Sequence, residues 1–483
     1  MNKITKESAL FFAGTFIPAA IGFISVPIFT RYFTPAEYGT NALIDTSFGY
    51  VDTIFFGIIS SIVWRYYNEY KKNKKKDVFF GLLAVMIRIS FAFIIVITIG
   101  IFIFSKYDSY TKYLIVTKSI AISIGAYVSV YSVVLRLDGK AKAFNIIMIF
   151  NSLANFALIY MLTKLFAMRN IAMYISATIV ALCGYIFLGW YYRKTPKTYL
   201  GTKETVKTLL PLLSYGVIAL LSNFTQHLLD SSDRYMITFF KDVNATGLYD
   251  KLYGISNRIM AIFCTVFMNL FSPYIYKHLE DKDAHDFFKQ LIPVFVGLFF
   301  PLVMYYSVFS DTICSILLAK EYSAWFFIIP CICLGYFCIC LANFGEMIII
   351  FRNPKEITIG FFLALVINVF LNALLIPRLD ILGAALGTAL SYLFVLLFFC
   401  YRAKLVSFYY FFAKNWKVNL LYLIPIAECC IYHFVIRKYV QGRIANVGLA
   451  VIFAATYFIP YLYYTFIKNK TFTQLFEDGN YEQ

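Results

Sequence analysis

Charged residues and enzyme motifs are scarce in this sequence. Asp, Glu, Lys and Arg make up 14% of its 483 residues, against roughly 25% in a typical globular protein. The four His are scattered, and the sequence contains no Walker A motif, no HExxH and no GxSxG. These motifs carry ATP hydrolysis, zinc proteolysis and serine hydrolysis, so we expect neither enzyme activity nor direct use of ATP. A disordered chain is also excluded, because it would need high charge and few apolar residues.

Cysteine is present but lacks the spacing of a metal-ligand set. The ten Cys include Cys331, Cys333, Cys338 and Cys340, which form CxC pairs inside an apolar run. Metal-binding Cys usually occur as CxxC pairs on turns, whereas free Cys often behaves as a small buried hydrophobe. We therefore predict no metal site, no cofactor and no disulfide framework.

Apolar residues dominate the chain instead. Hydrophobic residues make up 61% of the sequence and aromatics 20%, which is more than a soluble fold of this size can bury. A membrane-spanning helix needs about 20 mainly apolar residues, and the first apolar run is too long for a cleavable signal peptide. We predict an all-α polytopic membrane protein with about 14 transmembrane helices. They fall at residues 9–30, 41–64, 78–104, 114–135, 143–163, 171–191, 209–230, 246–274, 288–310, 323–350, 356–376, 382–400, 418–436 and 444–467.

The net charge of +17 would suggest a nucleic-acid partner in a soluble protein. Here the Lys and Arg follow the predicted loops, and more than twice as many fall on the N-terminal face as on the opposite face. Cytoplasmic loops carry such an excess. We therefore predict a multi-pass membrane protein with both termini in the cytoplasm and no nucleic-acid partner.

Two sequence echoes indicate an internal duplication. Asn151-Ser-Leu-Ala-Asn155 in the fifth predicted helix matches Asn368-Val-Phe-Leu-Asn372 in the eleventh. Arg31-Tyr32 and Gly39 follow the first helix, as Arg234-Tyr235 and Gly247 follow the seventh. An offset of six helices keeps both copies in the same orientation, as in parallel repeats that alternate access by rocking. The predicted organisation is an N-terminal lobe at 1–200, a C-terminal lobe at 201–404, and two further helices with a cytoplasmic tail at 405–483.

Two segments resemble a known family. Thr30-Arg-Tyr-Phe-Thr-Pro-Ala-Glu-Tyr-Gly39 is similar to the stretch after the first helix of Wzx-type polysaccharide flippases. Asn372-Ala-Leu-Leu-Ile-Pro377 and Ile381-Leu-Gly-Ala-Ala-Leu-Gly-Thr-Ala-Leu-Ser391 are similar to the junction of that family's eleventh and twelfth helices. The wider group is the multidrug/oligosaccharidyl-lipid/polysaccharide (MOP) exporter superfamily.

This resemblance implies two six-helix lobes around a central cavity. It implies a substrate of undecaprenyl-diphosphate-linked oligosaccharide, moved from the cytoplasmic to the outer leaflet for O-antigen, capsule or exopolysaccharide assembly. The implied partners are that lipid, the surrounding membrane lipids and a polysaccharide polymerase.

Cations inside predicted helices are the candidates for binding a diphosphate, because charge at bilayer depth usually faces a cavity or a partner. Arg88 and Arg258 lie near mid-membrane by their positions, and Lys251 shares a helix face with Arg258. Lys118 lies nearer the outer end of its helix and could equally snorkel. Arg31 ends the first helix, where an interface anchor is an equal interpretation. For Arg88 the structural alternative is an ion pair with an acid such as Asp52.

Buried acids and one His are the candidates for coupling to H+ or Na+. Asp45 and Asp52 share a face of the second predicted helix, and Glu346 lies in the tenth. A buried carboxylate can bind and release a proton near neutral pH, although a structural salt bridge would also explain each. His227 could carry a proton or serve as polar packing between helices.

Three other functions remain open at this point. A multidrug cation antiporter of the same superfamily would have a carboxylate-dominated cavity, which the central Arg residues disfavour. A membrane glycosyltransferase or polymerase would need a larger outer loop than 231–245, the longest predicted here. A flippase for the peptidoglycan precursor is also compatible with the sequence.

Overall fold

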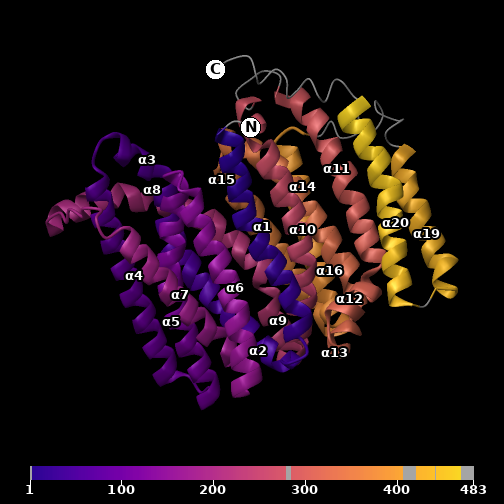
Figure 1. The fold of residues 1–483 in the computed structure, drawn as a ribbon, viewed down its shortest axis with the longest axis horizontal. Helices are drawn as coiled ribbons and strands as arrows, with labels where there is room; N and C mark the ends of the chain where they lie inside the picture. Colours follow the sequence, from indigo (N-terminus) through magenta and orange to yellow (C-terminus); the bar gives the residue numbers. More distant parts are fainter. Residues whose placement is uncertain (1–2, 279–283, 406–419, 441, 469–483) are drawn as a thin grey trace. The chain divides into compact units, whose positions relative to one another are not determined.

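The computed structural model describes residues 3–278, 284–405, 420–440 and 442–468, and every regular element in these ranges is a helix (Figure 1). The chain divides into two compact units, Met1–Asp250 and Lys251–Gln483. Each unit is described by itself.

Unit 1 begins with α1 (Lys3–Phe29) and ends within α10. Between them lie α2 (Pro35–Asp52), the π-helix η1 (Thr53–Gly57), α3 (Ile58–Lys72), α4 (Lys76–Phe104), α5 (Ser109–Leu137), α6 (Ala141–Phe166), α7 (Ile171–Tyr191), α8 (Thr202–Ser231) and α9 (Asp233–Phe240). Helix α10 (Val243–His278) starts in unit 1 and continues into unit 2.

Unit 2 contains the remaining helices. They are α11 (Ala284–Val308), α12 (Ser310–Leu317), α13 (Lys320–Ser323), η2 (Phe326–Ile328), α14 (Ile329–Arg352), α15 (Lys355–Leu379), α16 (Ile381–Arg402), η3 (Leu420–Tyr422), α19 (Leu423–Phe434), η4 (Ile436–Lys438), α20 (Arg443–Leu462) and η5 (Tyr463–Lys468).

The prediction of an all-α membrane protein is confirmed. Eleven helices within the described residues are long and apolar enough to cross a membrane. The other three predicted spans fall on α1, α10 and α19, which are helical as well. Large apolar side chains remain exposed along the helices, among them Val96 and Phe104 on α4. Such faces suit a lipid environment, where helices satisfy their backbone hydrogen bonds internally.

The second predicted span is longer than expected. Residues 41–64 lie inside one helical run from Pro35 to Lys72. Its start is fixed by Thr34, which caps α2, and by Pro35, whose fixed φ suits the first helical position. The helical run ends among polar residues at Lys72, because the hydrogen bonds of α3 continue beyond the apolar segment.

Aromatic side chains fill the core of each unit. In unit 1, Tyr67, Phe80 and Tyr131 are almost fully buried and pack together with Tyr192. In unit 2, Tyr457 and Tyr461 stack at 5.4 Å between ring centroids. Their hydroxyls donate to the carbonyls of Gly297 and Pro293 on α11, at 2.9 and 3.2 Å. These bonds join α20 to α11 while satisfying buried polar groups.

The Asn pairs of the sequence echo lie at matching helix contacts. Helix α7 packs against α5 and α6, as α16 packs against α14 and α15. In unit 1, Ser176 on α7 donates to Oδ1 of Asn155 on α6 at 2.5 Å. In unit 2, Asn368 on α15 lies 3.4 Å from the Thr388 hydroxyl on α16, and Asn372 donates to Asn368 at 2.9 Å. Polar side chains commonly link helices in this way inside membranes.

Candidate functional site

The segment that carries the family resemblance builds the N-terminus of α2. The Thr34 hydroxyl accepts the Glu37 N–H at 3.3 Å, and the Glu37 carboxylate accepts the Thr34 N–H at 3.0 Å. This reciprocal capping box satisfies two of the free donors at the helix start. Glu37 is only 8% exposed and also accepts Arg169 Nε at 2.7 Å. The motif therefore fixes α2 to the loop that precedes α7.

Gly39 of the same motif allows α2 to cross α10 at backbone contact. A Cβ added to Gly39 would lie 1.8 Å from the Val243 carbonyl oxygen, and one added to Gly247 would lie 1.8 Å from that of Pro35. The two glycines are equivalent in the sequence echo, and each meets the segment that precedes the other. Such reciprocal contacts are the mark of two-fold related surfaces. A side chain at either position would force the helices apart.

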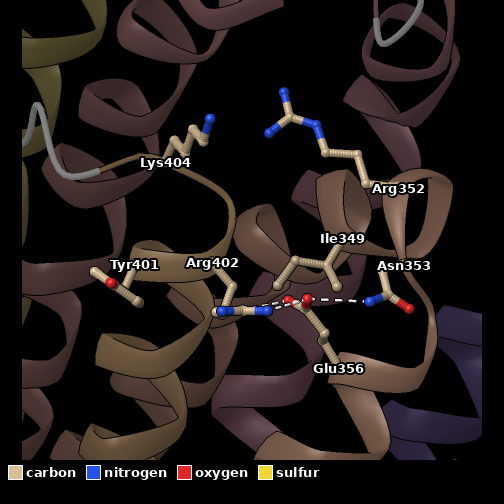
Figure 2. A pocket seen from close by; sticks show the side chains of 7 residues that line it. All are labelled: Ile349, Arg352, Asn353, Glu356, Tyr401, Arg402 and Lys404. Carbon is tan, nitrogen blue, oxygen red and sulfur yellow. Dashed lines mark hydrogen bonds and ion pairs between the residues drawn. The ribbon is translucent and has the colours of Figure 1, made fainter.

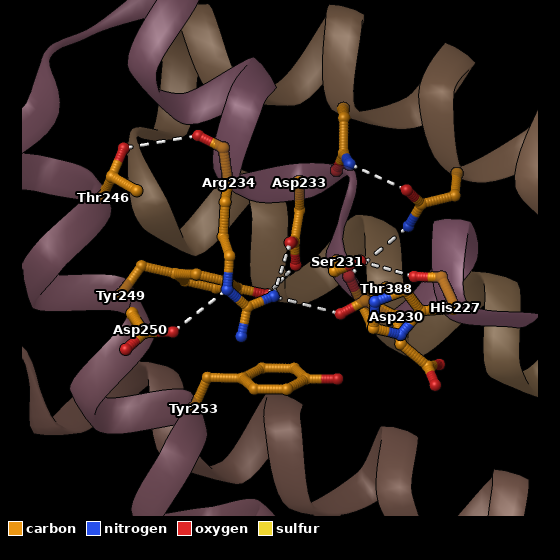
Figure 3. A network of polar contacts seen from close by, with 12 residues as sticks. His227, Asp230, Ser231, Asp233, Arg234, Thr246, Tyr249, Asp250, Tyr253 and Thr388 are labelled. Carbon is orange, nitrogen blue, oxygen red and sulfur yellow. Dashed lines mark hydrogen bonds and ion pairs between the residues drawn. The ribbon is translucent and has the colours of Figure 1, made fainter. Parts of the chain in front are cut away.

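Arg234 is the centre of a buried polar network beside this crossing (Figure 3). Its Nε lies 3.0 Å from Asp250 Oδ1, and its Nη1 lies 3.2 Å from Asp233 Oδ1. Tyr249 donates to the second oxygen of Asp233 at 2.5 Å. We call Asp233, Arg234, Tyr249 and Asp250 the Arg234 network.

The Arg234 network is well shielded from solvent. Asp233 is 0% exposed, the Arg234 side chain 11% and that of Asp250 20%. A buried ion pair is costly to break, because the remaining partner is left as an uncompensated charge. Two carboxylates on one guanidinium leave no positive charge for a ligand. The network therefore fixes α9 and α10 to each other.

The sequence prediction missed this network as a site. It counted Arg234 among the outer-loop cations and did not select Asp233 or Asp250. The available signal was the Asp233-Arg234-Tyr235 run, which repeats the Arg-Tyr pair at Arg31 and adds an acid. The structure places that run in α9, where the chain continues as helix after α8.

Lys118, a candidate cavity cation, is paired with a candidate coupling acid. Its Nζ lies 2.8 Å from Asp45 Oδ1 and 5.3 Å from the centre of the Tyr174 ring. Lys118 on α5 thus faces Asp45 on α2. The positive charge of Lys118 is therefore partly neutralised by Asp45.

Arg88 has a different environment on α4. The residue is exposed, and its Nη2 lies 3.4 Å from the Tyr199 hydroxyl, with the guanidinium 5.4 Å from the ring centre. A tyrosine ring attracts a cation without neutralising it. The structure therefore gives Arg88 an aromatic contact, and the described residues include no carboxylate bonded to it.

The remaining candidate cations occupy helix ends and faces. Arg31 is exposed and donates to the Pro27 carbonyl at 2.5 Å, which holds it at the C-terminal end of α1. On α10, Lys251 is half-buried and Arg258 is exposed. Within the described part of unit 1, Arg31, Arg88 and Lys118 share no partner. Their common role in a cavity stays a prediction.

Two predicted coupling acids have no bonded partner among the described residues. Asp52 is half-buried on α2 and is followed directly by the π-helix η1, a backbone irregularity that often marks functional sites. Glu346 is half-buried on α14. Glu428, another acid inside a predicted span, differs, because it accepts from Tyr305 at 2.5 Å and from Thr456 at 2.6 Å.

His227 on α8 packs tightly against α2. Its ring meets Tyr50 edge-on at 5.1 Å, and its Nε2 is buried with no hydrogen-bond partner in the described chain. A Cβ added to Gly49 would lie 2.7 Å from that nitrogen. These contacts agree with a packing role, while proton transfer by His227 stays a prediction.

Comparison with known proteins gives a family and a fold. A family model described as "Polysaccharide biosynthesis protein" matches residues 4–279, more than half of the chain. No curated protein sequence is significantly similar to the chain. Both the family match and the solved structures below agree with the predicted resemblance to polysaccharide flippases of the MOP superfamily.

Three solved structures illustrate the shared fold. "Lipid II flippase MurJ, inward closed conformation" is 14% identical with a TM-score of 0.72, over 94% of this chain and 100% of that one. A mutant of the Vibrio cholerae MATE transporter VcmN is 12% identical with a TM-score of 0.60, over 83% and 96%. A MOP superfamily transporter from Pyrococcus furiosus is 12% identical with a TM-score of 0.52, over 84% and 95%. At these identities the likeness establishes the fold alone.

Proposed function

We propose, because the chain belongs to the polysaccharide biosynthesis protein family, that it translocates undecaprenyl-diphosphate-linked oligosaccharide repeat units. Transfer runs from the cytoplasmic to the outer leaflet of a bacterial inner membrane and supplies surface polysaccharide assembly. The observation that carries this proposal is the family match over residues 4–279. The fold is shared with a protein whose name states that it flips lipid II, so a lipid-linked substrate suits the architecture.

The diphosphate is the part of this substrate that the described cations fit. Arginine binds phosphate oxygens in pairs through its planar fork. Arg88 suits this role, because it is exposed and its described contact is a tyrosine. Arg258 on α10 is exposed as well. Lys118 suits it less, because Asp45 already matches its charge. Scattered cations also allow release, which a transport site requires.

Alternating access is the proposed mechanism. The sequence echo relates two copies in the same orientation, and such repeats usually rock against each other. Asp52 and Glu346 are the proposed sites for a coupling ion, H+ or Na+, since neither is bonded to a described cation. A polysaccharide polymerase is the proposed consumer of the product.

The test uses cells that lack the gene and measures which leaflet holds the lipid-linked oligosaccharide. Complementation would compare the unaltered gene with Arg88→Ala and Arg258→Ala. Arg193→Ala is the matched control, because Arg193 is also exposed and contacts one aromatic ring, with 5.2 Å to the centre of Trp190. We expect repeat units trapped on the cytoplasmic leaflet, rescued by the unaltered gene and the control but not by the other two.

The outcomes separate the function from its site. Rescue by every variant would keep the flippase and overturn the role of Arg88 and Arg258. Normal outward delivery in the deletion strain, in a host with one such gene, would overturn the flippase itself.

Two other functions are kept as alternatives because the fold is shared with proteins of other activities. A protein named as a lipid II flippase has this fold, and a peptidoglycan-precursor flippase predicts that the deletion strain accumulates lipid II instead of polysaccharide intermediates. A multidrug resistance MATE family transporter has it as well, and a multidrug cation antiporter predicts increased drug sensitivity with normal glycan delivery. The same deletion strain distinguishes all three.

A further inference from the structure

Unit 2 contains a charged pocket that lies outside the proposed transport site. A cavity of about 590 Å³ opens where α14 ends, α15 begins and α16 ends. Its lining is formed by Ile349, Arg352, Asn353, Glu356, Tyr401, Arg402 and Lys404 (Figure 2). We call it the Arg352 pocket. Pockets of about 300–1,000 Å³ commonly hold small ligands.

One cation of the Arg352 pocket, Arg402, is already engaged in an ion pair with Glu356. Arg402 donates to both carboxylate oxygens of Glu356, and the Asn353 amide donates to one of them at 3.1 Å. A two-pronged contact between guanidinium and carboxylate fixes the geometry of both groups. The pair forms one wall of the pocket, and it neutralises Glu356, the only acid among the lining residues that the structure describes.

The other two cations have no such partner. Arg352 and Lys404 are exposed, and neither forms an ion pair within the ranges that the structure describes. In Figure 2 both side chains extend on the side of the pocket away from Glu356, with their charged ends toward each other. Two positive charges that converge without a carboxylate attract an anion that can contact both.

Lys404 holds this position through an unusual backbone conformation. The N–H of Lys404 donates to the Tyr401 carbonyl at 3.1 Å, and that of Leu405 donates to the Cys400 carbonyl at 2.9 Å. These two bonds form the Schellman motif that ends many helices. Its left-handed position is normally glycine, but here Lys404 adopts φ 60°. Left-handed backbone costs about 1 kcal/mol for a residue with a side chain, and such strain clusters at functional sites.

We propose that the Arg352 pocket binds a phosphate group, with Arg352 and Lys404 as its direct ligands. The Glu356–Arg402 pair is the wall that positions them. Two sources share this chemistry: the headgroup of an anionic phospholipid and a free phosphate or diphosphate. The pocket lies at the loops that the Lys and Arg distribution assigns to the cytoplasmic face, where basic pockets between helices bind anionic headgroups. The proposal does not depend on the transported substrate.

The test is native mass spectrometry of the purified full-length protein, titrated with phosphatidylglycerol, phosphatidylcholine and inorganic diphosphate. The variant is Arg352→Gln with Lys404→Gln. Its matched control is Lys140→Gln with Lys142→Gln, because these two exposed lysines flank the first residue of α6, on the same predicted face. At about 1 kcal/mol for each basic residue, or about 2 kcal/mol for the two, we expect the pocket variant to bind phosphatidylglycerol about thirtyfold more weakly. The control variant should bind it as the unaltered protein does.

The two ligand arms identify the source. A loss of about thirtyfold for phosphatidylglycerol with no detectable diphosphate binding supports the site and assigns it to a lipid. The same loss for diphosphate supports the site and assigns it to a free phosphate. Equal binding by the unaltered protein and the pocket variant in both arms would overturn the proposal, and so would equal loss in the control variant. Unfolding curves of all variants establish that the folded protein is being compared.

Discussion

The Arg234 network in unit 1 and the Arg352 pocket in unit 2 both combine arginine with carboxylates, with different results. In the Arg234 network one guanidinium meets two carboxylates (Figure 3) and the group is largely shielded from solvent. In the Arg352 pocket one carboxylate meets one of three cations and the rest stay exposed (Figure 2). The comparison teaches that burial and local charge balance, rather than the presence of Arg, separate a structural contact from a ligand site.

The largest expected effect is that of Arg234→Ala. Removing the guanidinium breaks its ion pairs with the buried Asp233 and the partly buried Asp250, and breaking a buried ion pair costs about 3–5 kcal/mol of folding free energy. Arg402→Ala is the matched control, because its side chain is 42% exposed and such pairs contribute about 0–1 kcal/mol. Unfolding in mixed detergent micelles measures both. Equal losses of folding free energy in the Arg234→Ala and Arg402→Ala variants would contradict the difference between the two sites.

The next largest effect is that of Gly39→Ala, at the crossing of α2 with α10. The added Cβ meets the Val243 carbonyl oxygen, and overpacking of this kind costs about 1–3 kcal/mol. Gly100→Ala on α4 should have the opposite sign, because nothing lies within 4 Å of its Cβ position and alanine favours a helix by about 0.5–1 kcal/mol. A stable Gly39→Ala variant would contradict the close crossing.

Asp138 forms a third charge cluster, intermediate between the other two. Partial burial would raise its pKa, but hydrogen bonds from Lys71, Lys76 and Tyr67 outweigh burial and hold the pKa below the usual value. The cluster therefore stabilises the fold above a pH of about 4, and this contribution is lost as pH falls through the lowered pKa. We expect Asp138→Asn to cost about 1 kcal/mol at neutral pH.

The pH dependence gives this prediction its check. The difference in unfolding free energy between the unaltered protein and Asp138→Asn should shrink as the pH falls below about 4. A difference that stays constant across that range would show that the carboxylate charge contributes nothing there.

The smallest expected effect on folding is that of Arg352→Gln with Lys404→Gln. Both side chains are exposed and lack a described ion-pair partner, so the free energy of unfolding should change by less than about 0.5 kcal/mol. Thermal unfolding in detergent measures this change. A loss as large as that of Arg234→Ala would make the Arg352 pocket a structural contact after all.

The sequence was sufficient to predict the helices, because the thickness of a bilayer sets the length of each apolar segment. Each predicted span needed about 20 apolar residues, and each overlaps a helix in the described part of the chain. Residues 418–419 of the span predicted at 418–436 lie outside the described residues. The error at residues 41–64 has a local cause, since hydropathy reports the lipid-facing part of a helix. The capping box at Thr34 and the polar turns that end at Lys72 lie outside that part.

The pairing of charges depended on helix crossings that a linear sequence does not specify. Asp45 and Lys118 were both identified as candidates, but their contact at 2.8 Å requires α2 beside α5. Arg234 falls in the predicted outer loop 231–245. In the structure it lies on α9, and its partner Asp250 lies on α10, which follows α9 after a short turn. Only the repeated Arg-Tyr pair indicated that this segment mattered.

The most direct test of the account is the rate at which the purified protein moves a labelled undecaprenyl-diphosphate oligosaccharide across liposomes, with and without an imposed proton gradient. Label accessible to a reagent that does not cross the membrane reports the transfer. The account predicts transfer by the unaltered protein and by Arg193→Ala, with a marked decrease for Arg88→Ala combined with Arg258→Ala. Transfer equal to that of protein-free liposomes under both conditions would contradict it.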